Sequence, residues 1–178
     1  RKVTFVNHFG ITLAADIYEP KEYTGKLPAI AVAGPFGAVK EQSSGLYAQE
    51  MAKRGFVAIA FDPSFTGESG GYPRSFNSPD INVEDYQAAI DFLSAQENVD
   101  AEKIGIIGVC GWGGMAIQTA ALDTRVKATA AILTALMQKA DMKHVLLTTI
   151  REQKIIKTAF MPQTAVCLKR RQRMPLSM

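Results

Sequence analysis

Apolar and polar residues alternate at the start of the chain, a period that is typical of half-buried strands. The alternation runs over residues 3–5 and again over residues 13–17, and Asn7-His8-Phe9-Gly10 supplies a turn between them. Pro20 follows the second stretch, and because it has no N–H it cannot extend a strand ladder. The first twenty residues therefore predict an antiparallel β-hairpin.

Further along, the alternation gives way to continuous runs of small apolar residues. Runs of this kind mark strands that are buried on both faces of a sheet. They lie at residues 29–33, 57–61, 104–107 and 126–133.

Helical periodicity fills the spaces between these runs. Residues 43–54 predict a helix that ends at Gly55, and residues 82–95 predict a second one with Asn82 as its cap and Glu84 and Asp85 in its first turn. Residues 113–122 are apolar almost all round and predict a short buried helix. Strands that alternate with helices form β-α-β units. We therefore expect an α/β fold, a mostly parallel sheet with an N-terminal antiparallel hairpin and helices on both faces.

Composition supports a globular chain. Apolar residues make up 47% of the 178 residues and charged residues 21%, and no run approaches the roughly 20 apolar residues of a membrane-spanning helix. Two cysteines, Cys110 and Cys167, do not form a disulfide framework. We expect no metal, no cofactor, no membrane partner and no nucleic acid.

The start, Arg1-Lys2-Val3, is neither an initiator Met nor a signal peptide, so preceding residues are expected to have been removed. The compartment stays open, with the cytoplasm favoured over secretion.

The charge is unevenly distributed along the chain. Residues 1–140 carry 12 Lys and Arg against 15 Asp and Glu, a net charge of −3, and residues 141–178 carry 8 against 2, a net charge of +6. All 14 glycines fall in the first part. We therefore expect a domain over 1–140 and, over 141–178, a basic tail of uncertain structure that a shifted reading frame or a truncated gene would explain. Its basic run 169–173 is more typical of a solvated chain end than of a nucleic-acid site.

Candidate chemistry lies where the third buried run meets the short helix. Gly108-Val109-Cys110-Gly111-Trp112-Gly113-Gly114 runs from a strand through a sharp turn into a helix, the setting of a nucleophile elbow with Cys110 as nucleophile. The helix N-terminus favours a thiolate, and the Gly111 amide is placed to stabilise an oxyanion. Trp112 departs from the pattern, which has a small residue there, and we interpret it as a widened turn or a residue that lines the binding pocket. The alternative is that Cys110 is a small buried residue in a tight turn.

Two further loops follow buried strands. Ala33-Gly34-Pro35-Phe36-Gly37-Ala38 is where a second oxyanion amide is expected, and since Pro35 lacks an N–H the donor is Phe36, or else Gly37. Phe61 to Gly71 crosses the C-terminal edge of the sheet, where open α/β sheets bind ligands, and we interpret Asp62 as a structural cap of that turn.

These loops, together with the hairpin, resemble the α/β-hydrolase family and within it the dienelactone-hydrolase-like and YcjY-like branch. The resemblance covers about residues 1–135, with the loops Gly-Pro-Phe-Gly-Ala-Val-Lys-Glu-Gln, Phe-Asp-Pro-Ser-Phe-Thr-Gly-Glu-Ser and Gly-Val-Cys-Gly-Trp-Gly-Gly in order. It implies esterase or lactonase chemistry through a Cys–His–Asp triad, with Cys110 at the nucleophile position and Gly111 as an oxyanion donor.

The resemblance ends before the rest of the triad. In the family the acid and the histidine follow two later strands, whereas this sequence enters its basic tail after residue 133. His8 lies in the hairpin turn and is expected at the surface, and His144 is expected on a solvated helix rather than as a base. Ile155, Ile156, Ala159 and Phe160 are a candidate short helix over the edge of the sixth strand, which otherwise invites pairing with a second copy.

Three functions therefore stay open. The first is a Cys110 hydrolase acting on a small ester or lactone, weak or inactive in this shortened form. The second is a non-catalytic binding or dimerisation module on the same fold. The third, phosphate or dinucleotide binding at Gly111-x-Gly113-Gly114, lacks the G-x-G-x-x-G spacing and the acidic residue after the next strand.

Overall fold

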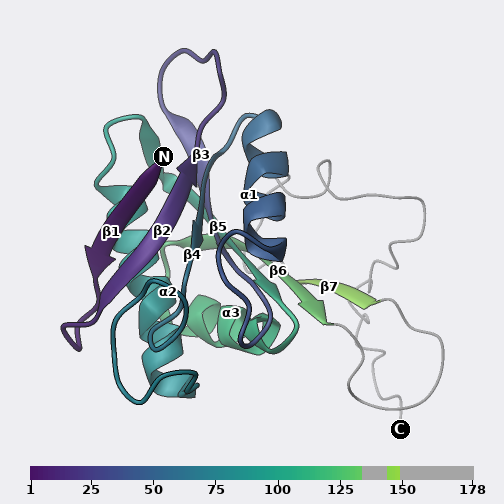
Figure 1. Cartoon of the computed structure of the whole chain (residues 1–178). Coiled ribbons are helices and arrows are strands. Elements are labelled where there is room, and N and C mark those ends of the chain that lie inside the picture. Colours follow the sequence, from purple (N-terminus) through teal and green to yellow (C-terminus); the bar gives the residue numbers. More distant parts are fainter. Residues whose placement is uncertain (134–143, 149–178) are drawn as a thin grey trace, which may run out of the picture.

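The computed structural model describes residues 1–133 and 144–148 (Figure 1). In chain order its elements are β1 Lys2–Val6, β2 Thr12–Tyr18, β3 Leu27–Ala33, α1 Ser43–Lys53, β4 Val57–Phe61, α2 Pro79–Ser94, β5 Val99–Val109, α3 Gly111–Leu122, β6 Val126–Leu133 and β7 His144–Thr148.

One mixed sheet organises these elements. Its strand order is β1-β2-β4-β3-β5-β6-β7. The hairpin β1–β2 is antiparallel and β2 runs antiparallel to β4, whereas β4, β3, β5 and β6 are parallel neighbours. The predicted fold class is confirmed.

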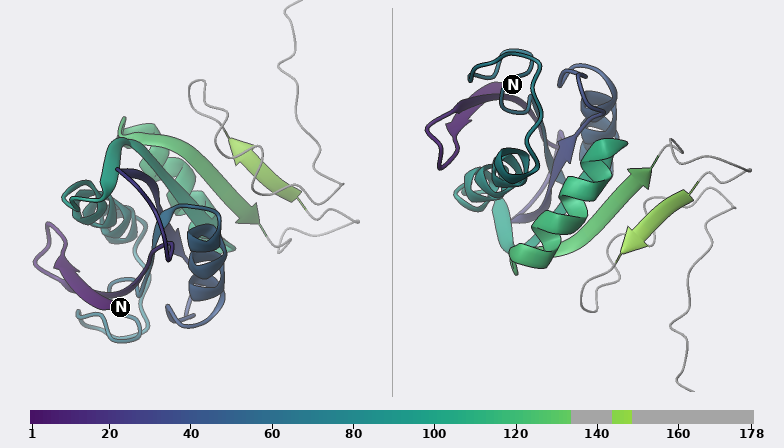
Figure 2. Two further views of the ribbon diagram at one scale, coloured as in Figure 1. Left: turned by 90° about the horizontal axis from the view of Figure 1, so that it is seen from above. Right: turned by 90° about the horizontal axis from the view of Figure 1, so that it is seen from below.

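Helices cover both faces of the sheet (Figure 2). Helix α1 packs on one face through Ala48 and Met51, against Val32 and Ile107 among others. Helices α2 and α3 share the other face and bury the larger core cluster. The carboxyl ends of β3, β4 and β5 lie at one edge of the sheet, where parallel strands bring their following loops together.

Local turn signals behaved as expected. The hairpin turn closes with a 2.9 Å hydrogen bond from the Gly10 amide to the Asn7 carbonyl, and Gly10 has a φ of 74°. After α1, Gly55 takes a φ of 91°, which is the left-handed conformation that ends many helices.

The start of α2 differs from the prediction. The helix begins at Pro79 with Ser78 at the cap position, so Asn82 is inside the helix and is not its cap. The Asn82 side chain is buried, where it accepts a 3.0 Å hydrogen bond from the Ser78 amide and donates another of 3.0 Å to Asp85. Glu84 and Asp85 accordingly lie beyond the first turn, whose acidic residue is Asp80.

The region after β6 also differs. His144 begins the strand β7 and does not lie on a helix, and β7 pairs antiparallel with β6 from Thr129↔Thr148 to Leu133↔His144. The outer edge of β6 is therefore not free, although it was expected to invite a second copy. Residues 155, 156, 159 and 160 lie outside the described residues, as do Cys167 and the basic run 169–173, and the boundary at residue 140 stays a prediction.

Candidate active site

Cys110 occupies the turn between β5 and α3. Its backbone has φ 59° and ψ −126°, a region that non-glycine residues rarely adopt. The turn is fixed on both sides, since the Cys110 amide donates to the Ile132 carbonyl at 2.7 Å and the Gly113 amide donates to the Cys110 carbonyl at 3.0 Å. The thiol is free and half-buried. A strained backbone thus holds a thiol beside the N-terminus of a helix.

At two positions around this turn, a side chain on the glycine would collide with a close neighbour. A Cβ on Gly108 would lie 2.1 Å from the Trp112 carbonyl oxygen, and a Cβ on Gly111 would lie 2.1 Å from the ring of Phe36. A Cβ on Gly114 meets nothing within 4 Å. The tight approach therefore occurs at Gly108 and Gly111, and Gly114 does not share it.

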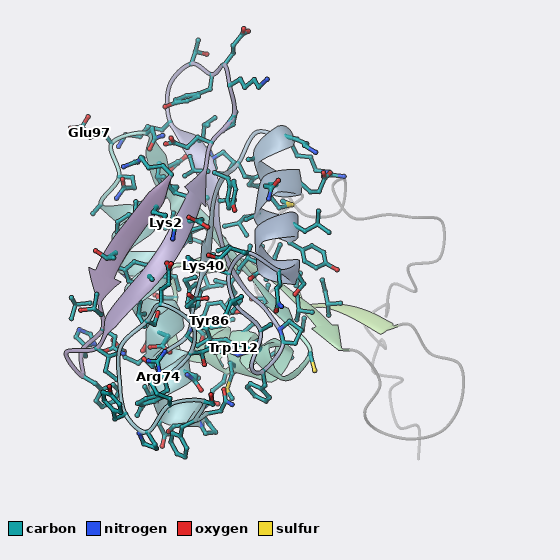
Figure 3. The ribbon with its side chains drawn as sticks, in the orientation of Figure 1. Lys2, Lys40, Arg74, Tyr86, Glu97 and Trp112 are labelled. Atoms are coloured by element: carbon teal, nitrogen blue, oxygen red, sulfur yellow. The ribbon has the colours of Figure 1, made fainter. Side chains whose placement is uncertain are left out.

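Trp112 points into the core. Its side chain is fully buried and its ring packs edge-on against Phe61 and Tyr86, with centroid distances of 5.8 Å and 5.2 Å (Figure 3). Its Nε1 has no hydrogen-bond partner in the described part of the chain. These contacts give the indole a packing role, and its predicted part in substrate binding stays a prediction.

Phe36 lies across the turn from Cys110. It belongs to the loop of residues 34–42 between β3 and α1, in a turn closed by a 3.0 Å hydrogen bond from the Ala38 amide to the Pro35 carbonyl. Its ring covers Gly111, and the residue as a whole is 45% exposed. Within residues 1–133 and 144–148 no acceptor is found for its amide. The Gly111 amide is at the first position of α3, where N–H groups lack partners in the helix. Both predicted oxyanion donors thus come from segments that touch beside Cys110.

A buried lysine ties the Phe36 loop to the next crossover. Lys40 is only 1% exposed, and its Nζ lies 2.8 Å from Glu41, 2.8 Å from Glu68 and 3.1 Å from Asp62. Figure 3 shows Lys40 close to Lys2, which pairs with Glu68 at 2.7 Å. Burial opposes the charged form of Lys40, yet the hydrogen bonds to the three carboxylates hold its pKa above the ordinary value.

Asp62 is structural, in keeping with its interpretation as a cap. It is fully buried just after β4, and its carboxylate accepts from the Lys40 amide at 2.6 Å and the Glu68 amide at 2.9 Å. Its carbonyl accepts from the Ser69 hydroxyl at 2.7 Å. One side chain therefore fixes the turn after β4 and the loop after β3 together.

A second buried carboxylate, Asp85, joins the hairpin turn, the β4 loop and α2. It accepts hydrogen bonds from the Ser64 hydroxyl at 2.6 Å, the Ser64 amide at 2.9 Å, Asn7 at 2.9 Å and Asn82 at 3.0 Å. Burial raises the pKa of Asp85, and these hydrogen bonds oppose the shift.

No base faces Cys110 among the side chains that the structure describes. His8 is 79% exposed in the hairpin turn, as predicted, and its Nδ1 lies 2.7 Å from Glu84. His144 is placed in β7 by its backbone, opposite Leu133. The same residues contain no group of His, Cys, Asp or Glu that would hold a metal ion, and no helix long and apolar enough to cross a membrane.

Sequence reasoning missed the roles of Lys40, Glu68 and Asp85. Lys40 lies in a loop that drew attention for Phe36, and Asp85 was interpreted as a helix-dipole residue. A lysine in an otherwise small and apolar loop directly after a buried strand is the one signal that pointed to a buried ion pair.

The sequence model of the family described as X-Pro dipeptidyl-peptidase (S15 family) matches residues 10–172. The chain belongs to this family. The S15 match includes the Cys110 turn, the Phe36 loop and the Asp62 turn.

Relatives and solved structures match between 71% and 89% of the chain. The uncharacterized protein PA2218 of Pseudomonas aeruginosa is 67% identical over 129 residues, 72% of this chain and 35% of its own, and its crystal structure superposes with a TM-score of 0.71 over 72% of this chain and 40% of that one. The uncharacterized protein YcjY of Escherichia coli K12 is 44% identical over 131 residues, 71% of this chain and 43% of its own. The thiohydrolase aneE of Aspergillus aculeatus is 34% identical over 161 residues, 89% of this chain and 50% of its own.

The fold is that of α/β hydrolases. The α/β hydrolase GrgF from a Penicillium species is 24% identical and superposes with a TM-score of 0.68 over 72% of this chain and 44% of its own. The chain spans about a third to a half of the length of the curated relatives it matches. The YcjY-like part of the resemblance is supported, and the dienelactone-hydrolase-like part stays a prediction.

Proposed function

We propose that this chain carries the nucleophile and the oxyanion site of an acyl hydrolase that acts on small carboxylic esters or lactones. The observation that carries the proposal is the φ of 59° at Cys110, which projects the thiol from a strained turn at the start of α3. Membership of a hydrolase family supports it.

Each step uses groups beside that turn. The Cys110 thiolate attacks the substrate carbonyl carbon, and the carbonyl oxygen becomes an oxyanion that accepts hydrogen bonds from the Gly111 and Phe36 amides. Collapse of the tetrahedral intermediate breaks the ester C–O bond, releases the alcohol after it gains a proton, and leaves a thioester on Cys110. Water then attacks the thioester and breaks its C–S bond, which releases the carboxylic acid and restores the thiol on Cys110.

The second half of this cycle needs a base. A base deprotonates the attacking water, and losing a triad member costs orders of magnitude in turnover. Since no described side chain is placed as that base, we expect acylation of Cys110 to outrun hydrolysis, with slow turnover or none. His144 and a second chain are the two candidates for that group.

The test is mixing with p-nitrophenyl acetate, which releases coloured nitrophenolate on acylation. We expect one burst of nitrophenolate per chain and one acetyl group on the peptide that contains Cys110, detected by mass spectrometry. Sustained turnover that H144A abolishes would identify His144 as the base.

Matched controls separate Cys110 from other nucleophiles. C110A should lose the burst, whereas C167S changes the other cysteine and should keep it. An equal burst in C110A and the unsubstituted chain contradicts the proposal and leaves the non-catalytic module as the better description. The name of the Aspergillus relative makes a thioester the second substrate to try.

A further inference from the structure

The loop of residues 34–42 carries two residues that differ in burial, Phe36 and Lys40. Phe36, near its start, has its ring against Gly111, and its amide makes no hydrogen bond to the described residues. Lys40, near its end, is almost completely buried. Between them Gly37 has a φ of 76°, the value required at the third position of a type II turn. Since only a tight turn separates the two residues, the position of Lys40 constrains that of the Phe36 amide.

A single carboxylate grips Lys40 at both of its nitrogen atoms. Asp62 accepts from the Lys40 backbone amide through Oδ1 at 2.6 Å and from Nζ through Oδ2 at 3.1 Å. We call this pair of bonds the Lys40–Asp62 clip. It joins residues 22 apart in sequence. A shift of Lys40 relative to Asp62 would break at least one of the two bonds, so the clip fixes the position of Lys40.

The Asp62 end of the clip is anchored in the sheet. The Asp62 amide donates to the Ala14 carbonyl of β2 at 2.8 Å. A Cβ on Gly67 would lie 2.3 Å from Oδ2 of Asp62, so the loop after β4 packs directly on the carboxylate. The clip therefore fixes the position of the Phe36 loop relative to β2 and β4. These two strands lie outside the β3–β5 pair that bears the elbow.

Lys40 is not suited to direct chemistry. Its Nζ already donates to Asp62 and Glu68 and contacts Glu41, so the ammonium is stabilised where it stands. A lysine must lose its proton to act as base or nucleophile. What remains is a role in geometry, where an ammonium buried among carboxylates is costly to displace.

We propose that Lys40, through its clip to Asp62, is a positioning residue that sets the Phe36 amide as the second oxyanion donor for Cys110. This inference rests on the proposed function and adds a residue to it. Removing the clip should leave the thiol in place and weaken only the step in which negative charge develops on the substrate oxygen.

Two reagents separate these effects at the same sulfur. Acetylation by p-nitrophenyl acetate passes through an oxyanion, whereas alkylation by iodoacetamide displaces iodide at a saturated carbon and forms none. The quantity to measure is the ratio of the acetylation rate to the alkylation rate of Cys110, in a C167S background. Loss of one oxyanion donor typically costs about 10²–10³ in rate. We expect K40M and D62N to lower the ratio at least about tenfold while alkylation changes by less than about twofold.

A double-mutant cycle shows whether Lys40 acts through Phe36. F36P removes the amide donor at a turn position that accepts proline, and F36A removes the ring and keeps the donor. F36P should lower the ratio of the two rates as K40M does, and the K40M/F36P double variant should have a ratio little lower than that of either single variant. F36A should keep most of the ratio of the unsubstituted chain. Additive losses overturn the proposal.

A control cation lies at the opposite edge of the sheet. Arg125 contacts Asp91 and Asp123 just before β6, so R125M breaks another contact of one cation with two carboxylates, a more exposed one far from the elbow, and should leave the ratio unchanged. If K40M fails to fold, E68Q removes a half-exposed partner of Lys40 and should lower the ratio about two- to threefold.

The outcomes separate the two proposals. An unchanged ratio in folded K40M, or in E68Q if K40M does not fold, overturns the role of Lys40 alone, as does an equal fall of both rates. If iodoacetamide labels Cys110 in the unsubstituted chain but p-nitrophenyl acetate does not, the proposed function fails and this inference with it.

Discussion

At the scale of single residues, the turn around Cys110 depends on neighbouring glycines, which have no side chain. Gly108 faces the Trp112 carbonyl, which belongs to backbone and cannot move aside, whereas Gly111 faces the Phe36 ring, which can rotate or shift. A side chain added at Gly108 should therefore cost more stability than one added at Gly111. Substitutions at glycine test this difference directly.

We expect G108A to destabilise the protein by about 1–3 kcal/mol, the usual cost of overpacking a buried site. G114A is the matched control, because its Cβ would meet nothing and alanine favours a helix by up to about 1 kcal/mol over glycine. Urea unfolding of both variants measures the difference. A G108A variant as stable as G114A would show that the turn relaxes freely.

Glu68 predicts a dependence on pH at the same scale. The hydrogen bond from Lys2, and then that from Lys40, lower the pKa of Glu68 from 4.5 to about 2. Between those values the unfolded chain binds a proton at Glu68 that the folded chain does not, so stability is lost as the pH falls through this interval and is fully present above it. E68Q should lose less stability from pH 5 to pH 2 than the unsubstituted chain does. Parallel curves from urea titrations at each pH would contradict this assignment. Asp85, whose raised pKa acts in the opposite sense, is common to both chains and cancels.

At the scale of elements, α3 presents two different ends. Its first turn holds Trp112 in the ring cluster with Phe61 and Tyr86, and its last residue, Leu122, is largely exposed. The hydroxyl of Tyr86 donates to the Ile107 carbonyl of β5 at 2.8 Å, so α2, α3 and β5 meet around these rings. Trp112 is two residues after Cys110, so this junction adjoins the Cys110 turn.

W112A should therefore cost about 3–5 kcal/mol, as aromatic truncations in cores do. L122A, in the same helix, should change stability by less than about 0.5 kcal/mol. Thermal and urea unfolding give both values. A W112A variant of nearly normal stability but weakened substrate binding would restore the interpretation of Trp112 as a pocket residue.

At the scale of the whole molecule, the sequence predicted those features that depend on short-range pattern. Buried strands were visible as small apolar runs, and the sharp turn between β5 and α3 was visible because glycines surround Cys110. The start of α2 was missed because Asn82 resembles a cap while its side chain serves a buried network with Asp85. The Lys40–Asp62 clip was missed because nothing local joins residues on two different crossovers.

The hydrogen bond from the Cys110 amide to Ile132 has a consequence for heat inactivation. Ile132 is the second-last residue of β6, and the ends of elements open more readily than their centres. When the end of β6 frays, the strained backbone at Cys110 loses its lateral support while α1, α2 and α3 stay folded. The rate of Cys110 acetylation should therefore collapse on warming several degrees before the helical ellipticity does. If the two quantities fall at the same temperature, the Cys110 turn and the helices unfold as one unit. If acetylation is lost first, the reactivity of Cys110 reports the opening of the sheet before the helices unfold.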